Sequence, residues 1–495
     1  MSTVNIFNTL ESKVVPFAPA DQRRIKWYTC GPTVYDASHL GHARNYISQD
    51  IIRRILEDYL GYEVELVMNI TDIDDKIILR SQDAQIPIKD LTTKYEKEFF
   101  RDMDRLYIKR PSMVTRVSEY IPQIIAYIQR IIDNGFAYPS NGSVYFDMEA
   151  YSKKFPYGRL HSVDNEASHM SGRLKDKNVD KRSQTDFALW KKSHDTEPSW
   201  PSSWGSGRPG WHVECSVMSS AILGSSFDIH SGGEDLKFPH HENELAQACA
   251  HNNTGNWVRY FVHTGHLHIN GCKMAKSLKN FITIETALKD YTPRQIRILF
   301  LLHHYRDILN YSPETMRTAI TTENSIQEFL NQTRALLDKS EITSWAIREC
   351  SFRSVFYEIQ DHIDLALRDD FDTPKVFEHI GRLIKQTYIY MNSLNTSNVY
   401  LIRSIRNYLE RILRILGLDF EIRDTGSVPV LALLDTVTDF RNNLRQILKD
   451  PQYTEVKTLK RDIFKISDHY RDVILPGLGM HIDDTAAGKA IWKIK

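Results

Sequence analysis

The fold is decided by residues 25–70, which read IKWYTCGPTVYDASHLGHARNYISQDIIRRILEDYLGYEVELVMNI. The stretch opens with a short apolar run that ends at Cys30 and is followed by a Gly-Pro pair, a pattern typical of a strand and its end. Isoleucines then recur at helical spacing, and Gly61 suits the position just past the end of a helix. A second apolar run ends at Ile70. Strand, glycine-containing loop, helix and strand form a βαβ unit, so we expect an α/β fold built on a parallel sheet.

Beyond this unit the apolar pattern predicts further elements of both kinds. Residues 91–133 repeat with a helical period, and an Asn-Gly pair indicates a hairpin within residues 137–148. We then expect a strand that ends at Asp228-Ile229, a turn at residues 231–233 and a helix over residues 240–250. The early part of the chain is therefore predicted to mix strands and helices.

Two changes of composition divide the remaining sequence. Residues 151–182 are polar, charged and glycine-containing, which predicts a loop-rich insertion. From Pro293 to Leu416 glycine is scarce and apolar residues recur at spacings of three and four, which predicts a mostly helical region. Glycine and proline near residues 425–429 indicate a linker to a small terminal unit.

Bulk composition excludes several classes of protein. The 495 residues are 41% hydrophobic and 25% charged, a mix typical of a soluble globular chain with roughly two to four domains. No apolar run approaches the roughly 18 residues that span a bilayer, and the N-terminus lacks a secretory pattern, so we expect no membrane partner. The 5 scattered cysteines favour a reducing cytosol over a disulfide framework. Because 63 basic residues balance 63 acidic ones, an RNA partner would have to bind through local patches, and nothing in the sequence sets an oligomeric state.

Two short motifs are candidates for binding phosphate. His39 and His42 flank Gly41 between a predicted strand and a predicted helix, where unpaired backbone N–H groups attract anions. Lys273 and Lys276 lie in a second motif, Lys-Met-Ala-Lys-Ser, where a lysine pair would neutralise a triphosphate. Taken singly, the first motif is as compatible with two ordinary surface histidines as with a phosphate site, and the second favours a solvated basic loop.

Four further residues form a candidate metal site. Cys30 closes the first strand, Cys215 follows a Gly-Trp-His-Val-Glu segment, and His240 and Glu244 are one helical turn apart. Two thiolates, an imidazole and a carboxylate make a plausible zinc set. The alternative interpretation is structural: two cysteines of the core beside a solvated acidic helix. Sequence spacing alone does not decide between the two, because the four residues are far apart along the chain.

These segments together resemble the cysteinyl-tRNA synthetases, a family of class I aminoacyl-tRNA synthetases. The two phosphate motifs stand in the order and context of the two class I signatures, with Leu40 where isoleucine is usual and Ala275 where serine is usual. Both lysines of the second motif are kept, so we expect activation to survive. The resemblance is dense from about residue 5 to residue 310, is closest to eukaryotic cytosolic members, and returns near the C-terminus. It rests on four segments in particular: residues 28–36, 69–76, 210–215 and 228–244.

The resemblance implies a Rossmann-like catalytic domain that is interrupted by an insertion and followed by a mostly α-helical tRNA-binding region. The implied parts are two catalytic halves at 1–95 and 205–290, a connective insertion at 96–204, a stem-contact region at 291–330, a helical bundle at 331–425 and an anticodon-binding unit at 426–495.

The resemblance also implies a reaction and its site residues. ATP and L-cysteine would form cysteinyl-adenylate, and tRNA(Cys) would then accept the cysteine, in the cytoplasm. The implied roles are phosphate stabilisation by His39, His42, Lys273 and Lys276; ATP binding by Gly41, His42, Lys276 and Ser277; cysteine binding by Thr71, Trp211, His230 and Asp235; metal binding by Cys30, Cys215, His240 and Glu244; and anticodon binding by Asp484 and Trp492.

The implied cofactors are Zn²⁺ held by the protein and Mg²⁺ that accompanies ATP. Cysteine and serine differ by one atom, and shape alone would distinguish them only about ten- to hundredfold. A zinc-bound thiol loses its proton and becomes a strong ligand, whereas an alcohol remains a poor one. We therefore expect the metal to select cysteine without a separate editing domain.

Three other functions are compatible with parts of the pattern. A related cysteine ligase passes cysteine to a small-molecule amine, but it lacks most of the C-terminal region. A silent tRNA-binding paralogue would be expected to lose signature or ligand residues, and all of them are present. A zinc hydrolase would need a motif such as His-Glu-x-x-His, which does not occur.

Overall fold

The chain divides into two compact units, residues 1–419 and 420–495. A computed structural model describes residues 3–161, 180–194, 197–273, 280–339, 345–393, 398–420, 440, 444, 456–474, 480–484 and 490–494.

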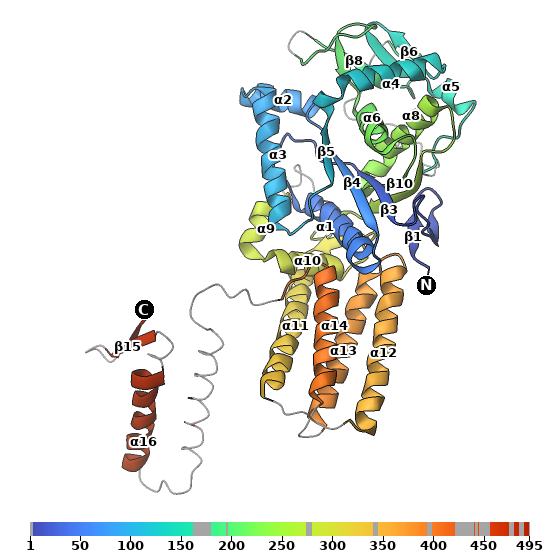
Figure 1. Cartoon of the computed structure of the whole chain (residues 1–495). Helices are drawn as coiled ribbons and strands as arrows, with labels where there is room; N and C mark the ends of the chain where they lie inside the picture. The colour runs from blue at the N-terminus through green and yellow to red at the C-terminus, as the bar shows by residue number, and fades with distance from the viewer. Residues whose placement is uncertain are drawn as a thin grey trace. The chain divides into compact units, whose positions relative to one another are not determined.

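The first unit is organised around a parallel sheet of five strands in the order β11-β10-β3-β4-β5 (Figure 1). Its strands are β3 (Arg24–Thr29), β4 (Glu63–Ile70), β5 (Met113–Arg116), β10 (Phe227–Gly233) and β11 (Val258–Thr264). Every neighbouring pair in this sheet is parallel, as the βαβ pattern of residues 25–70 predicts.

Helices connect the strands and set a point where the strand order reverses. α1 (Leu40–Arg54) links β3 to β4, and α2 (Asp75–Ala84) and α3 (Ile88–Arg105) precede β5. α8 (Glu242–Asn252) links β10 to β11. The chain therefore proceeds from β3 toward β5 in one direction and from β10 toward β11 in the other. In open α/β sheets, ligands bind outside the carboxyl ends of strands at such a point, which here lies between β3 and β10.

Local sequence explains how the first βαβ unit forms. The isoleucines of α1 are buried, and Gly61 adopts a φ of +80° after the π-helical turn Ile55–Tyr59 that extends the helix. Gly31 permits a close approach between strand ends, because a Cβ at this position would lie 1.6 Å from the carbonyl oxygen of Asn69. The ends of β3 and β4 are thereby held together.

An insertion with its own antiparallel sheet stands between β5 and β10. The sheet has the order β6-β7-β8-β9, with β6 (Ala137–Ser140), β7 (Ser143–Phe146), β8 (Phe187–Lys192) and β9 (Gly207–Pro209). The hairpin predicted within residues 137–148 is thus present. Its helices are α4 (Ile121–Asp133) and α5 (Met148–Ser152), and α6 (Trp211–Leu223) leads back to β10.

A helical region follows the sheet. A short mixed sheet, β13-β12-β14, first joins β12 (Leu267–Ile269), β13 (Cys272–Lys273) and β14 (Leu309–Tyr311). The helices after residue 283 are α9 (Ile284–Asp290), α10 (Pro293–Leu301), α11 (Pro313–Lys339), α12 (Ile347–Arg368), α13 (Thr373–Asn392) and α14 (Val399–Ile415). α11 to α14 run side by side in Figure 1, and the predicted mostly helical region is confirmed.

Smaller elements complete both units. β1 (Asn5–Asn8) and β2 (Lys13–Pro16) form an N-terminal hairpin. The second unit contains α16 (Val456–His469) and the antiparallel pair β15 (Met480–Asp484) and β16 (Ala490–Ile494). Over the described residues, no helix combines the length and apolar character that a membrane span requires.

Three sequence expectations are wrong in detail. The helical stretch predicted over 91–133 contains the strand β5, whose four residues are too few to register against the helices on either side. The turn predicted at residues 231–233 is the last part of β10, which runs to Gly233 because glycine is compatible with extended backbone. The helix predicted from His240 begins at Glu242, and His240 lies in the irregular turn Lys237–His241 before it.

Candidate active site

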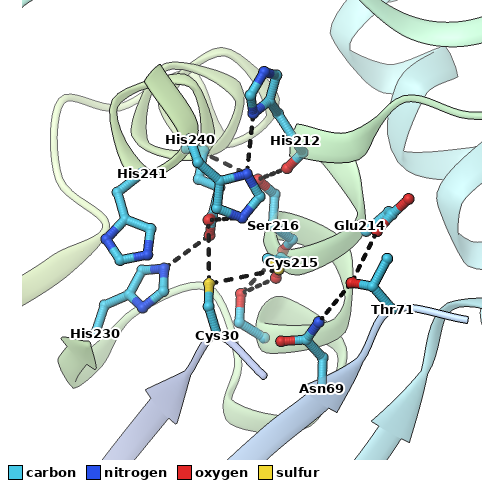
Figure 2. Close-up of polar contacts among 12 residues, drawn as sticks. Cys30, Asn69, Thr71, His212, Glu214, Cys215, Ser216, His230, His240 and His241 are labelled. Atoms are coloured by element: carbon cyan, nitrogen blue, oxygen red, sulfur yellow. Dashed lines mark hydrogen bonds and ion pairs between the residues drawn. The ribbon is translucent and has the colours of Figure 1, made fainter. Parts of the chain in front are cut away.

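A buried group of metal-ligand side chains lies at the carboxyl ends of β3 and β10. Cys30 follows β3, Cys215 is on α6, His240 lies in the turn Lys237–His241 before α8, and Glu244 lies in the first turn of α8. One ligand atom from each of the four lies within 4.8 Å of the others, and all four residues are buried. Figure 2 shows Cys30, Cys215 and His240 converging on one point. The structure thus brings together four residues that are far apart in the sequence.

The distances within this group suit a metal ion. The Sγ atoms of Cys30 and Cys215 are 3.7 Å apart, and Cys30 Sγ is 3.6 Å from Glu244 Oε1. His240 Nε2 lies 2.9 Å from the same carboxylate oxygen. Thiolate and imidazole ligands favour borderline and soft metals over magnesium or calcium.

Contacts within the group outweigh the effect of burial on the pKa values of three of its members. Burial alone would raise the pKa of Cys215, but its bond with Cys30 and the adjacent His240 lower that pKa to about 6. Burial would lower the pKa of His240, but Glu244 and Cys215 raise it to about 9. Burial would also raise the pKa of Glu244, whereas His230 and His240 lower it to about 2. The Cys215 thiolate and the Glu244 carboxylate are thus stabilised in this buried group by His240, by His230 and by the bond with Cys30.

Further histidines surround the group and orient it. His230 Nε2 is 2.8 Å from Glu244 Oε2, and His212 Nδ1 is 3.0 Å from His240 Nδ1. His241 Nδ1 contacts His263 Nε2 at 2.8 Å. Burial lowers the pKa values of His241 and His263 well below the ordinary value, so these imidazoles are neutral. Such outer contacts fix the rings of ligand histidines and orient ligand carboxylates.

The residues expected to bind cysteine come from four segments, and two of them, Trp211 and His230, contact the metal group. Thr71 follows β4, and its hydroxyl lies 3.2 Å from Asn69 Nδ2 and 3.5 Å from Glu214 Oε2. Trp211 stacks on His240 with ring centroids 4.2 Å apart, and His230 is fully buried in β10. Asp235 is exposed in α7 (Glu234–Leu236), and among the described contacts none joins it to Thr71. Trp211 and His230 are therefore in direct contact with candidate metal ligands, His240 and Glu244.

The two histidines of the first phosphate motif form a reciprocal cap at the start of α1. The backbone N–H of His42 donates to His39 Nδ1, and the backbone N–H of His39 donates to His42 Nδ1, both at 3.3 Å. Their rings stack with centroids 3.7 Å apart. Because each Nδ1 accepts a hydrogen bond, each ring carries its proton on Nε2. Desolvation and the neighbouring His39 hold the pKa of His42 well below its ordinary value, so His42 is a neutral donor.

Comparison with known proteins places the chain in a family. Residues 16–321 match the family described as tRNA synthetases class I (C) catalytic domain. The chain is 45% identical to "Cysteine--tRNA ligase, cytoplasmic" of Dictyostelium discoideum, with 99% of this chain and 77% of that protein covered. It is 43% identical to "Cysteine--tRNA ligase" of Encephalitozoon cuniculi, with 90% and 92% covered. The chain belongs to the cysteine–tRNA ligase family.

A solved structure supports the same fold class for this family member. The methionyl-tRNA synthetase of Mycobacterium tuberculosis, solved with methionyl-adenylate, aligns with a TM-score of 0.58 and 16% identity. The alignment covers 80% of this chain and 90% of that one. The expected class I architecture, a Rossmann-like core followed by helices, is confirmed.

The other residues implied by the family resemblance are only partly described. Lys273 is the last residue of β13, whereas Lys276 and Ser277 lie outside the described residues. Gly41 lies in the first turn of α1. In the second unit Trp492 pairs with Ile482, and Asp484 pairs with Ala490, in the β15–β16 ladder.

Two residues near the metal group were missed by the sequence analysis. Glu214 is a buried carboxylate beside Thr71, and His212 contacts the candidate ligand His240. Both precede Cys215 in the Gly-Trp-His-Val-Glu-Cys segment, so adjacency to a candidate ligand was the available signal. The sequence could not show which of them faces the site.

Proposed function

We propose that this protein attaches L-cysteine to tRNA(Cys) in two steps through a cysteinyl-adenylate. The buried group Cys30, Cys215, His240 and Glu244, in a chain of the cysteine–tRNA ligase family, is the observation that carries the proposal. In the first step a carboxylate oxygen of cysteine attacks the α-phosphorus of ATP, and pyrophosphate leaves. In the second, the 2′-hydroxyl of the terminal tRNA ribose attacks the carbonyl carbon of the adenylate, and AMP leaves. The relatives' names support the cytoplasm as the compartment in which this occurs.

We assign zinc to the metal group. Zinc with thiolate ligands at about 2.3 Å in tetrahedral geometry would need a sulfur–sulfur separation of about 3.8 Å. The 3.7 Å between the two Sγ atoms fits that requirement. Bound there, zinc would supply a soft Lewis acid that binds the thiolate of cysteine far better than the hydroxyl of serine. His230 would fix the orientation of Glu244, and Trp211 that of His240.

The start of α1 is suited to the phosphates of ATP. The reciprocal cap orients the Nε2–H groups of His39 and His42 beside a helix N-terminus. Gly41 between them adds no side chain to obstruct an approaching ligand. As charge develops on the phosphoryl oxygens, these fixed donors stabilise it without reorganising. Lys273, Lys276 and Ser277 would bind the β- and γ-phosphates together with Mg²⁺.

The cysteine pocket then lies between the phosphate site and the metal group. Thr71 and Asp235 would bind the ammonium group, and the buried Glu214 beside Thr71 adds a negative charge on that side. Trp211 and His230 would enclose the side chain. The ammonium is thus held near β4 while the thiol reaches the end of β3.

The remaining parts of the chain would bind tRNA. We place the connective insertion between β5 and α6, because β5 belongs to the parallel sheet and β9 to the insertion's sheet. Residues 291–330 would contact the acceptor stem, and residues 331–425 would make up the helical bundle. Residues 426–495, with Asp484 and Trp492, would read the anticodon, where an aromatic ring can stack on an unpaired base.

Cysteine-dependent exchange of pyrophosphate with ATP tests this proposal. We expect exchange with cysteine and not with serine, its loss after zinc is removed by chelation, and its return when zinc is restored. Charging of tRNA(Cys) should follow, which separates this function from transfer of cysteine to a small amine. Absence of exchange in folded, zinc-loaded protein would refute the assignment.

A further inference from the structure

The turn between α10 and β14, residues 304–307, is held by a buried arginine from α1. Nη2 of Arg44 donates to the carbonyl oxygens of His304 at 2.6 Å and Asp307 at 3.3 Å, and Nη1 donates to Phe300 O at 3.5 Å. Arg44 is 1% exposed, and within the described part of the chain no carboxylate forms an ion pair with it. The guanidinium also lies over the Phe300 ring, 5.6 Å from its centroid, and its printed hydrogen bonds all go to backbone carbonyls of this segment, so it fixes the position of the turn.

The same turn is tied to the strands that lead into the second phosphate motif. The backbone N–H of Gly265 donates to Tyr305 O at 2.9 Å, and the N–H of Leu309 donates to His266 O at 2.9 Å. A Cβ at Gly265 would lie 2.2 Å from Asp307 O, so the backbones are packed directly together. β14 then pairs with β12, and β12 pairs with β13, which ends at Lys273. The location of Lys273 therefore depends on the turn.

Residues that follow the second motif are bonded to the start of α1 itself. The N–H of Leu40 donates to Ile282 O, and the N–H of Ile284 donates to Ser38 O, both at 3.0 Å. One side of the motif is thus joined directly to the helix that carries His39 and His42. The other side reaches α1 through the turn and Arg44, and also through Thr264, whose hydroxyl donates to Asn45 Oδ1 on α1 at 2.7 Å.

A second anchor fixes the turn from the helical region. Asp370, at the junction of α12 and α13, accepts hydrogen bonds from Tyr305 Oη at 2.7 Å and from Arg306 Nε at 2.8 Å. It also accepts from the backbone N–H of Phe7. Asp370 is 3% exposed and adopts a φ of +54°, which aspartate and asparagine tolerate better than most residues.

We propose that Arg44 is a positioning residue for ATP: it fixes the turn 304–307, and through it β13, relative to His39 and His42. Asp370 supports the same turn from the opposite side. The inference rests on the proposed function, because it assigns the space between α1 and β13 to ATP. The cysteine pocket is built on β3, β4, α6 and β10, which Arg44 does not contact. Loss of Arg44 should therefore lower kcat/KM for ATP and leave KM for cysteine unchanged.

The test compares Arg44→Lys with Arg297→Lys in the full zinc-loaded protein. A lysine keeps the charge but cannot span the carbonyls that the guanidinium joins. We expect kcat/KM for ATP in cysteine-dependent exchange to fall about ten- to hundredfold per active site, with KM for cysteine unchanged. Amide hydrogen exchange should accelerate over residues 300–311. Arg297 is the buried control: it is also 1% exposed and bonded to backbone carbonyls, it pairs in addition with Asp50, and it touches neither the turn nor β13.

Several outcomes separate this inference from its alternatives. An unchanged kcat/KM for ATP in folded Arg44→Lys would overturn it, as would an equal loss in Arg297→Lys, which would indicate only a weakened core. If Arg44→Lys does not fold, Asp370→Asn replaces it. That variant keeps the shape and the backbone preference of the residue but removes its charge. A threefold or greater fall in kcat/KM for ATP, with KM for cysteine unchanged, would support the proposal. An unchanged value in that variant would overturn it. Absence of exchange in the parent protein would instead refute the proposed function.

Discussion

At the scale of single residues, Cys215 is the proposed metal ligand whose role can be tested most directly. Serine at this position is nearly isosteric but is a poor zinc ligand at neutral pH. We expect Cys215→Ser to weaken zinc binding at least about a hundredfold and to abolish cysteine-dependent exchange. Zinc content after dialysis against a competing chelator measures the first effect. Cys249→Ser is the matched control because Cys249 is equally buried but lies outside the donor group; equal zinc loss in both variants would contradict the assignment.

His42 allows the capping and catalytic roles of one ring to be separated. Asparagine at this position retains an acceptor close to Nδ1 but lacks the Nε2–H donor, whereas glutamine retains a donor near Nε2. We expect His42→Asn to keep the thermal midpoint and to lose roughly a hundred- to thousandfold in kcat for exchange. His42→Gln should keep more activity and lose more stability. Parallel melting curves and exchange rates check this, and the opposite order would show that the ring acts only as a cap.

The residue scale also shows what the sequence could and could not predict. Cys30, Cys215, His240 and Glu244 were selected by residue type and by resemblance, since 184 residues separate the first two and no spacing rule joins them. Glu214 and His212 were missed because a helix turns each residue by about 100° and the sequence does not show which face points to the site. The chemistry of the donors was predictable, but their outer contacts were not.

At the scale of elements, α1 and α10 are joined by a buried ion pair. Asp50 Oδ2 lies 2.7 Å from both Arg297 Nη1 and Arg54 Nε, and Asp50 also accepts the backbone N–H of Lys109. Burial alone would raise the pKa of Asp50, but Arg297 and Arg54 outweigh it and hold that pKa below its ordinary value. The pair connects the catalytic sheet to the start of the helical region.

Asp50→Asn should therefore destabilise the first unit in a pH-dependent way. It leaves Arg297 buried without a counter-charge, so we expect a loss of about 3 kcal/mol in the free energy of unfolding at pH 7. The pKa of Asp50 is about 4 in the unfolded protein and lower in the folded protein, so the ionised carboxylate stabilises the fold fully above about pH 4. This stabilisation is lost as the pH falls through the lower, folded-state pKa. The difference between parent and variant should then shrink as the pH falls below about 4. Urea unfolding at several pH values measures it, and a difference independent of pH would refute the ionic explanation.

The same scale explains the errors in predicting elements. β5 has only four residues between helical segments, so a window long enough to detect a helix averages over it. β10 ends in Ser-Gly-Gly, which local rules assign to a turn, yet pairing with β11 continues to Gly233. Pairing partners that lie far away in the sequence decided both cases, and local propensity does not contain them.

At the scale of the whole molecule, the strand order creates the site. β10 pairs with β3 rather than with the strand that precedes it in the chain, and this brings α6 and the start of α8 to the end of β3. The βαβ pattern predicted a parallel sheet, but strand order cannot be read from periodicity. The family resemblance implied a Rossmann-like domain but not the order of its strands.

The division into two units predicts that the two reaction steps can be separated by truncation. All residues proposed to bind ATP, cysteine and zinc precede residue 278, and the packing of the first unit includes Leu416 and Leu418, which are buried. A chain that ends at Phe420 should keep cysteine-dependent exchange within about threefold, because its core and its site are intact. The same chain should charge tRNA(Cys) at least about a hundredfold more slowly, since each lost base contact weakens RNA binding by about 1–3 kcal/mol. Exchange and charging rates measured on one folded preparation test this. Parallel loss of both activities would show that residues 421–495 support the catalytic unit, and retention of both would show that the anticodon is read elsewhere.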